Sequence, residues 1–185
     1  MPLTSPAGEI GAVLVGRVVF RGRVPAPEVV TVTRDPKACG ETRTIQPLVV
    51  DPSTGGIQDA VVSIEGAPTS PITDMTKTTA ITNRQCAFTP HIEAIRIGTS
   101  LDIRSQDPVL HNTHIKTGKR TFLNVALVPG GNSLTKVIKM PGLYHVQCDA
   151  HVFMQGYMVA FDHPYYAVTQ AHGDFRIVGV PAGRH

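Results

Sequence analysis

Glycine and proline recur every few positions along the whole chain, with 17 and 15 residues respectively. Proline interrupts helical hydrogen bonding and both residue types favour turns, so almost no window is left for a helix of three turns. Between the turns lie nine short runs rich in β-branched side chains, which are typical of strands. These runs are 12–20, 28–33, 60–65, 92–97, 101–104, 136–140, 143–148, 158–161 and 175–178. They predict an all-β sandwich or barrel, and the polar, threonine-rich stretch 67–83 predicts a long surface loop.

The composition indicates one folded domain. Of the 185 residues, 42% are apolar and 17% are charged, which is too apolar for a disordered chain and too lightly charged for a long solvated helix. No apolar run is long enough to cross a bilayer, and the first residues lack the basic and apolar parts of an export signal. If the protein is exported, we expect its targeting segment to have been removed. The net charge is +3 and the basic residues are scattered, so we expect no nucleic acid partner.

Three side chains that suit a soft metal fall within seven positions in the second half of the chain. Cys148, His151 and Met154 offer a thiolate, an imidazole and a thioether, and this set favours copper over calcium or magnesium. A trigonal copper site needs a second imidazole, which His111 in the segment DPVLHNTH can supply. Taken singly, each residue is more often a packing or structural residue. Together, at this spacing, they predict a metal site, and zinc would accept the same Cys and His ligands.

The segments around these residues resemble a known family. The run PGLY at 141–144, followed by Cys148 and His151, is similar to the P-G-x-Y-x-x-x-C-x-x-H run of plastocyanin-like domains. The pair His111-Asn112 and the preceding segment 88–98, which opens with Phe-Thr-Pro, are also similar to their counterparts there. The chain therefore resembles the cupredoxins, the blue copper proteins.

That resemblance implies a Greek-key β-sandwich that holds one mononuclear copper ion. The implied copper ligands are His111, Cys148, His151 and Met154. Asn112 is expected to hydrogen-bond across to the ligand loop and to support it. Only two residues separate His151 from Met154, as in the dinuclear copper loop of cytochrome oxidase, but that centre needs a second Cys in the loop and this sequence has none. Met158 is the alternative axial ligand.

A closer resemblance runs along nearly the whole chain, to bacterial secreted plastocyanin-like proteins often labelled methylamine-utilisation or carboxypeptidase-regulatory-like proteins. The similar segments, in order, are GRVVFRG at 16–22, DPKACG at 35–40, CAFTPH at 86–91, DHPYY at 162–166, GDFRI at 173–177 and VPAG at 180–183. The resemblance implies a single domain over 1–185. Its copper-binding core would span 60–161, with an N-terminal strand extension over 1–59 and a C-terminal one over 162–185.

The chain has three cysteines, and an odd number in an exported protein leaves one thiol with another role. If Cys148 binds copper, Cys39 and Cys86 are expected to form a disulfide, and the protein is expected to be periplasmic or extracellular. The alternative is two reduced cysteines in a cytosolic protein.

The resemblance implies a carrier of single electrons rather than an enzyme, with a redox partner such as a c-type cytochrome or a membrane oxidoreductase complex. No acid–base pair or Ser/His/Asp array is apparent in the sequence. An alternative is a copper-binding structural subunit or copper chaperone of a larger assembly, and a third is a copper redox enzyme with an open metal position. In a carrier, we expect the apolar residues of 152–157 to surround an exposed edge of His151 and to form a docking patch.

Overall fold

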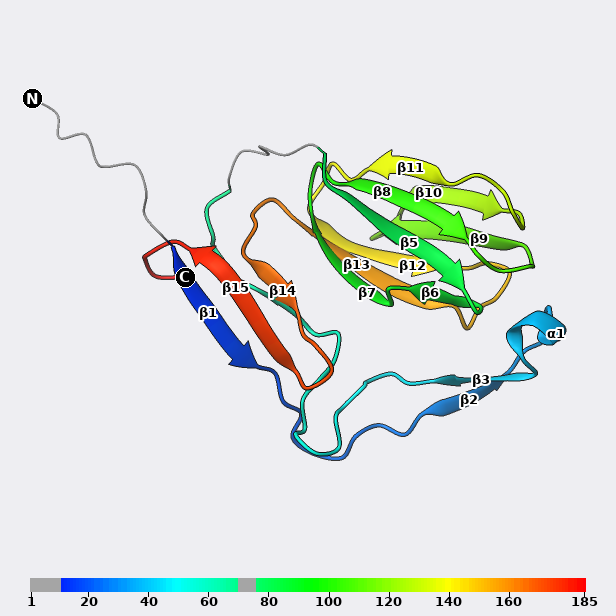
Figure 1. Ribbon diagram of the computed structural model, residues 1–185, viewed down its shortest axis with the longest axis horizontal. Coiled ribbons are helices and arrows are strands. Elements are labelled where there is room, and N and C mark those ends of the chain that lie inside the picture. The colour runs from blue at the N-terminus through cyan, green and yellow to red at the C-terminus, as the bar shows by residue number, and fades with distance from the viewer. Residues whose placement is uncertain (1–10, 70–75) are drawn as a thin grey trace, which may run out of the picture.

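The computed structural model describes residues 11–69 and 76–185, and its centre is a sandwich of two β-sheets (Figure 1). Nine strands build the sandwich: β5 (Thr78–Arg84), β6 (Ala87–Thr89), β7 (Ile92–Arg96), β8 (Ser100–Ser105), β9 (His111–Thr117), β10 (Arg120–Leu127), β11 (Leu134–Val137), β12 (Gly142–Gln147) and β13 (Gln155–Phe161). One sheet has the strand order β10-β9-β12-β13-β7, and the other has β11-β8-β5-β6. The prediction of an all-β sandwich is confirmed.

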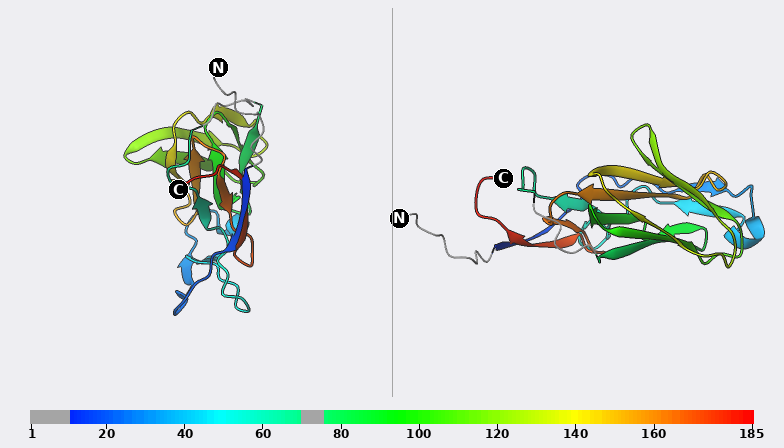
Figure 2. Two further views of the ribbon diagram at one scale, coloured as in Figure 1. Left: turned by 90° about the vertical axis from the view of Figure 1, so that its left-hand side faces the viewer. Right: turned by 90° about the horizontal axis from the view of Figure 1, so that it is seen from above.

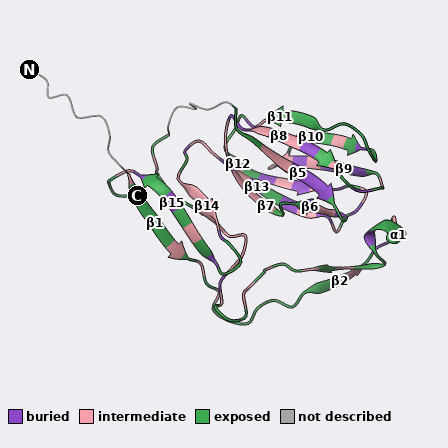
Figure 3. Cartoon of the chain, viewed as in Figure 1, coloured by how far each residue is buried: buried purple, intermediate pink, exposed green. Residues whose placement is uncertain are grey.

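The core lies between the two sheets, where Figure 3 shows most of the buried residues. Leu101 and Ile103 on β8 are fully buried there, whereas Arg104 of the same strand is exposed. Ile115 of β9 and Met158 of β13 are also fully buried. Side chains of a strand alternate between its two faces, so the apolar positions of β8 face the opposite sheet.

Further strands at both ends of the chain lie outside the sandwich, as predicted. They form three two-stranded sheets, which pair β1 (Ala12–Arg17) with β15 (Asp174–Val180), β4 (Val61–Ser63) with β14 (Tyr166–Val168), and β2 (Glu28–Thr31) with β3 (Thr42–Ile45). A short helix, α1 (Pro36–Cys39), joins β2 to β3. We call residues 28–45 the arm. It runs beside the sandwich and carries α1 to the end that lies away from β1 and β15 (Figures 1 and 2). No helix of the described residues is long and apolar enough to span a membrane.

The nine predicted runs miss six strands, β3, β5, β6, β9, β10 and β14, and in β5 and β9 the inner face is polar. The sequence predicts no strand at β9, whose inward residues include His111 and Thr113 beside Ile115. The predicted loop 67–83 is wrong from Thr78 onward, because β5 starts there and pairs in parallel with β8; residues 70–75 of that prediction lie outside the described residues. In both strands, buried polar side chains hide the apolar alternation that identifies a strand.

Candidate metal centre

Two segments far apart in sequence bring the predicted ligands together at one end of the sandwich. His111 is the first residue of β9, whereas Cys148, His151 and Met154 lie on the loop between β12 and β13. Two backbone hydrogen bonds hold that loop in a tight turn, from Cys148 N to Met154 O (3.2 Å) and from Met154 N to His151 O (2.8 Å). Because β9 and β12 are neighbours in one sheet, the loop after β12 lies beside the start of β9. We call residues 148–154 the ligand loop.

One thiol and two imidazoles point their donor atoms at a common position. The Nδ1 atoms of His111 and His151 are 3.2 Å apart, and Cys148 Sγ lies 4.0 Å from the first and 3.7 Å from the second. All three side chains are at most 1% exposed. Three donor atoms at these separations can share one metal ion.

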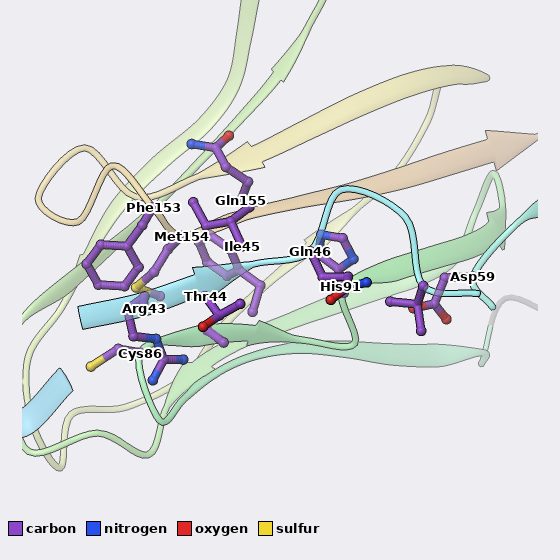
Figure 4. A pocket seen from close by; sticks show the side chains of 13 residues that line it. Arg43, Thr44, Ile45, Gln46, Asp59, Cys86, His91, Phe153, Met154 and Gln155 are labelled. Carbon is purple, nitrogen blue, oxygen red and sulfur yellow. The ribbon is translucent and has the colours of Figure 1, made fainter. Parts of the chain in front are cut away.

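The two methionines of this region lie in different places. Met154 is buried at the end of the ligand loop, and it also lines a pocket of about 290 Å³ between the arm and the sandwich (Figure 4). Met158 is fully buried on β13, in the core between the sheets. Met154 is therefore the methionine that belongs to the same loop as two of the three donors.

A hydrogen bond on the far side of the His111 ring determines which ring nitrogen presents its lone pair to the site. His111 Nε2 lies 2.9 Å from Asp107 Oδ2. A carboxylate only accepts hydrogen bonds, so Nε2 carries the proton and Nδ1 presents a lone pair to the site. Burial, and after it the neighbouring His151 ring, lower the pKa of His111, against the opposing effect of Asp107. His111 is therefore a neutral imidazole at neutral pH, the form that binds a metal.

The His151 ring has a carboxylate behind it as well. Its Nε2 lies 3.2 Å from Asp35 Oδ2, which is within ion-pair distance, but the oxygen is poorly aligned with the ring and makes no regular hydrogen bond. A proton on Nε2 is the arrangement that the negative oxygen favours. The Nδ1 lone pairs of His111 and His151 then face each other across 3.2 Å. A metal cation relieves their repulsion without a buried imidazolium, so the donor set fits a metal ion.

Asn112 ties β9 to the ligand loop. Its Oδ1 accepts hydrogen bonds from the backbone N–H groups of Asp149 (2.7 Å) and Ala150 (3.3 Å), and Cys148 Sγ lies 3.4 Å from the same oxygen. Its Nδ2 donates to Asp149 Oδ2 at 2.9 Å. This is the contact across to the loop that the resemblance implied, and it holds Cys148 against the strand that carries His111.

The expected docking patch around an exposed edge of His151 is wrong. His151 is 1% exposed, and the arm reaches it through Asp35. Phe153 is half-buried, with its ring against His151 on one side and the guanidinium of Arg43 5.9 Å from its centroid. Of the residues that follow His151, Val152 is 79% exposed. The sequence gives no local signal that residues 28–45 fold back over the ligand loop.

The disulfide that holds the arm in place joins Cys39 to Cys86, and Cys148 is free and buried. This pairing agrees with the expectation that followed from assigning Cys148 to the metal. Asp35 and Asp107 were not among the predicted site residues. In the sequence, Asp107 stands four residues before His111 and ends the segment Ser105-Gln106-Asp107, which resembles the N-x-D strand end of the family.

Comparisons with known proteins find partial structural similarity to several copper proteins. No family model and no curated protein matches the chain. A copper-containing nitrite reductase from Thermus scotoductus SA-01 aligns with 55% of this chain at 18% identity and a TM-score of 0.42, and the chain spans 25% of that protein. Amicyanin from Paracoccus versutus aligns over 56% of this chain and all of its own length, with 16% identity and a TM-score of 0.41. A purple cupredoxin from Nitrosopumilus maritimus aligns over 46% of this chain and 99% of its own length, with 20% identity and a TM-score of 0.39.

Proposed function

We propose that the chain is a cupredoxin-like protein that binds one copper ion through His111, Cys148 and His151, with Met154 as a weak axial ligand, and that it carries single electrons. The observation that supports this most is the buried triangle of two imidazole Nδ1 atoms and one sulfur, 3.2 to 4.0 Å apart. A soft thiolate with two imidazoles favours copper. Copper bound there would alternate between its +1 and +2 states and so accept and release one electron.

The residues around the donors favour transfer of an electron over catalysis on a bound substrate. The four proposed ligand side chains are at most 2% exposed, so none of them offers an edge to a small molecule in solution. Asn112 and Asp107 hold the ligand loop and His111 by hydrogen bonds. Donors that are held in place move little when the charge of the site changes, which is the property that a carrier needs.

The proposal extends to the setting of the protein. A disulfide fits an oxidising compartment, so we propose a periplasmic or extracellular protein with a c-type cytochrome or a membrane oxidoreductase complex as redox partner. The site would belong to a core over 60–161 within a single domain, flanked by the strand extensions 1–59 and 162–185.

One observation favours the alternative of a subunit in a larger assembly. The ribbon of β1 and β15 exposes apolar side chains, with Val15 at 65%, Val178 at 53% and Val13 at 48%, and β1 pairs with no described strand other than β15. An exposed apolar strand edge is suited to pairing with another chain. A stable monomer in gel filtration that is reduced and reoxidised freely favours the carrier, whereas co-purification in a stoichiometric membrane assembly favours the subunit.

Titration of the metal-free protein with Cu(II), followed by visible absorption, tests the proposed function. We expect an intense thiolate-to-copper band that stops growing at one equivalent of copper. Zn(II) binds the same ligands without colour and serves as the control, since prior addition of Zn(II) should delay the band. A colourless one-to-one Cu(II) complex would contradict the proposal.

The axial ligand can be tested by a substitution that conserves volume. Met154→Leu should keep the visible band and raise the reduction potential by about 59 mV, which is a tenfold loss of preference for Cu(II) over Cu(I), because the thioether that stabilises Cu(II) is lost. Met158→Leu, on the core strand β13, is the matched control and should leave the potential unchanged. The opposite pattern in a redox titration of the two variants would assign the axial position to Met158.

A further inference from the structure

We infer that two carboxylates, Asp107 and Asp35, are positioning residues of the metal centre, and that the arm is therefore part of this centre. Each carboxylate lies next to the Nε2 atom of one ligand imidazole, on the side of the ring away from the Nδ1 donor. The inference rests on the proposed function, because it assigns these residues a role toward the copper ion.

Asp107 is buried, and both of its carboxylate oxygens accept hydrogen bonds. The residue is 7% exposed. Its Oδ1 accepts the backbone N–H of Gln85 at 2.6 Å, and its Oδ2 accepts the backbone N–H of Cys86 at 2.9 Å as well as His111 Nε2–H at 2.9 Å. A carboxylate with three donors cannot turn away from the ring, so it fixes both the orientation of His111 and the nitrogen that carries its proton.

The two N–H groups that Asp107 accepts belong to an unusual turn. Gln85 and Cys86 both have a φ of 53° and connect β5 to β6 as a two-residue hairpin loop. Such loops strongly favour glycine or asparagine, because other side chains are strained at positive φ. Asp107 compensates by capping both N–H groups, so the same carboxylate supports the turn that carries Cys86 and the ring that faces the metal.

Asp35 reaches the other ring from the arm. It precedes α1, has a φ of 53°, and places Oδ2 3.2 Å from Nε2 of the buried His151. The Asp35 side chain is 36% exposed, so it lies between the buried His151 ring and the solvent. Arg43 of β3 adds a second contact between the arm and the ligand loop through the ring of Phe153, and its guanidinium also donates to the carbonyl of Cys39 at 3.4 Å.

These contacts form a continuous path that links the two imidazoles. From His111 the path runs to Asp107, then to the N–H of Cys86, across the disulfide to Cys39, along α1 to Asp35, and back to His151. The disulfide is therefore the link between the two carboxylates. It sets where the arm carries Asp35 relative to the ring that Asp107 holds.

Two consequences follow from a carboxylate behind each imidazole. Asp107 holds the proton of His111 on Nε2 by a hydrogen bond, and the charge of Asp35 favours a proton on Nε2 of His151, which leaves both Nδ1 atoms to bind the metal. The hydrogen bond from Asp107 also raises the basicity of His111 as a ligand. Asp35 acts on His151 through its negative charge alone, and the charge of each carboxylate stabilises the more positive ion. The pair thus favours Cu(II) over Cu(I) and lowers the reduction potential of the site.

The first measurement needs no copper. In the metal-free full-length protein, nitrogen NMR of the histidine rings should show His111 and His151 with the proton on Nε2. Asp35→Asn should change the ring signals of His151, and Asp107→Asn those of His111. Asparagine tolerates a positive φ well, so Asp35→Asn keeps the backbone and remains informative if Asp107→Asn fails to fold.

The second measurement uses the copper-loaded protein. Asp35→Asn and Asp107→Asn should each keep the visible band and weaken Cu(II) binding by about tenfold, the lower end of the usual loss for residues that orient metal ligands. With Cu(I) binding unchanged, this loss raises the reduction potential by about 59 mV. Glu28→Gln removes the same charge from an exposed position of the arm, at the end of β2 away from α1, and should leave the potential and both rings unchanged.

The two measurements separate the inference from the proposed function. If Cu(II) gives the wild type no visible band while the NMR pattern is as expected, the copper proposal fails and the positioning role stands. If the band forms but the ring signals and potentials of both Asp→Asn variants match those of Glu28→Gln, the inference is wrong. If the ring signals and the reduction potential change in Asp107→Asn but not in Asp35→Asn, the positioning role assigned to Asp35 and the arm is wrong.

Discussion

Cys148→Ser is expected to abolish the visible absorption of the Cu(II)-loaded protein completely. The band arises from charge transfer between a thiolate and copper, and Cys148 is the only free cysteine of the chain, since Cys39 and Cys86 are joined. Serine is nearly the same size, and its hydroxyl can donate to Asn112 Oδ1, which lies 3.4 Å from the sulfur in the wild type. The fold should therefore survive while the chromophore is lost.

Visible spectra recorded at one equivalent of Cu(II) check this result, with far-UV circular dichroism as the test of folding. Met158→Leu serves as the control, because it also removes a buried sulfur but one on the core strand β13, and it should keep the full band. A Cys148→Ser protein that is folded and still coloured would show that the colour comes from another site.

Removal of the disulfide, as Cys39→Ala with Cys86→Ala, is expected to lower the free energy of unfolding by about 4 kcal/mol. The two cysteines are 47 positions apart, and a cross-link across a loop of this length restricts the unfolded chain strongly. Both residues are also buried at 3% and 2% exposure, so alanine leaves unfilled space as well. The loss is a large part of the stability of a domain of this size.

Urea unfolding of the metal-free proteins measures this loss, and a reductant supplies the control. Adding a dithiol to the wild type should shift its midpoint toward that of the double variant, whereas the double variant itself should not respond. A loss below about 1 kcal/mol would mean that the arm is held by its other contacts, such as those of Arg43 and Asp35, and that the covalent link adds little.

The part of the metal centre that could be predicted from sequence is the part that is local in the chain. Cys148, His151 and Met154 share one tight loop, and their spacing alone predicts a set of metal ligands. His111 could be added because a β-sandwich brings one distant strand beside such a loop. The contact of Asn112, the next residue of that strand, with the loop is the one that the resemblance to cupredoxins implied.

The outer part of the centre could not be predicted, because it depends on contacts between distant segments. Asp35 reaches His151 only because the arm folds back along the sandwich, and no periodicity in residues 28–45 shows where that arm will lie. The burial of His151 follows from the same folding, so the exposed edge expected for it was wrong. β9 was missed for a different reason, since His111 and Thr113 fill inward positions where the strand signal needs apolar side chains.

The burial of the candidate donors places protein between the proposed metal position and any molecule that approaches it. His111, Cys148, His151 and Met154 are at most 2% exposed, so under the proposed function an electron would have to tunnel through the layer of side chains that covers them. Small oxidants and reductants in solution are kept at a distance by the same layer. If copper is bound there, electron exchange would be fastest with a partner that fits the surface well enough to shorten the tunnelling path. Selectivity among partners would then depend on the shape of this covering layer as well as on the reduction potential of the ion.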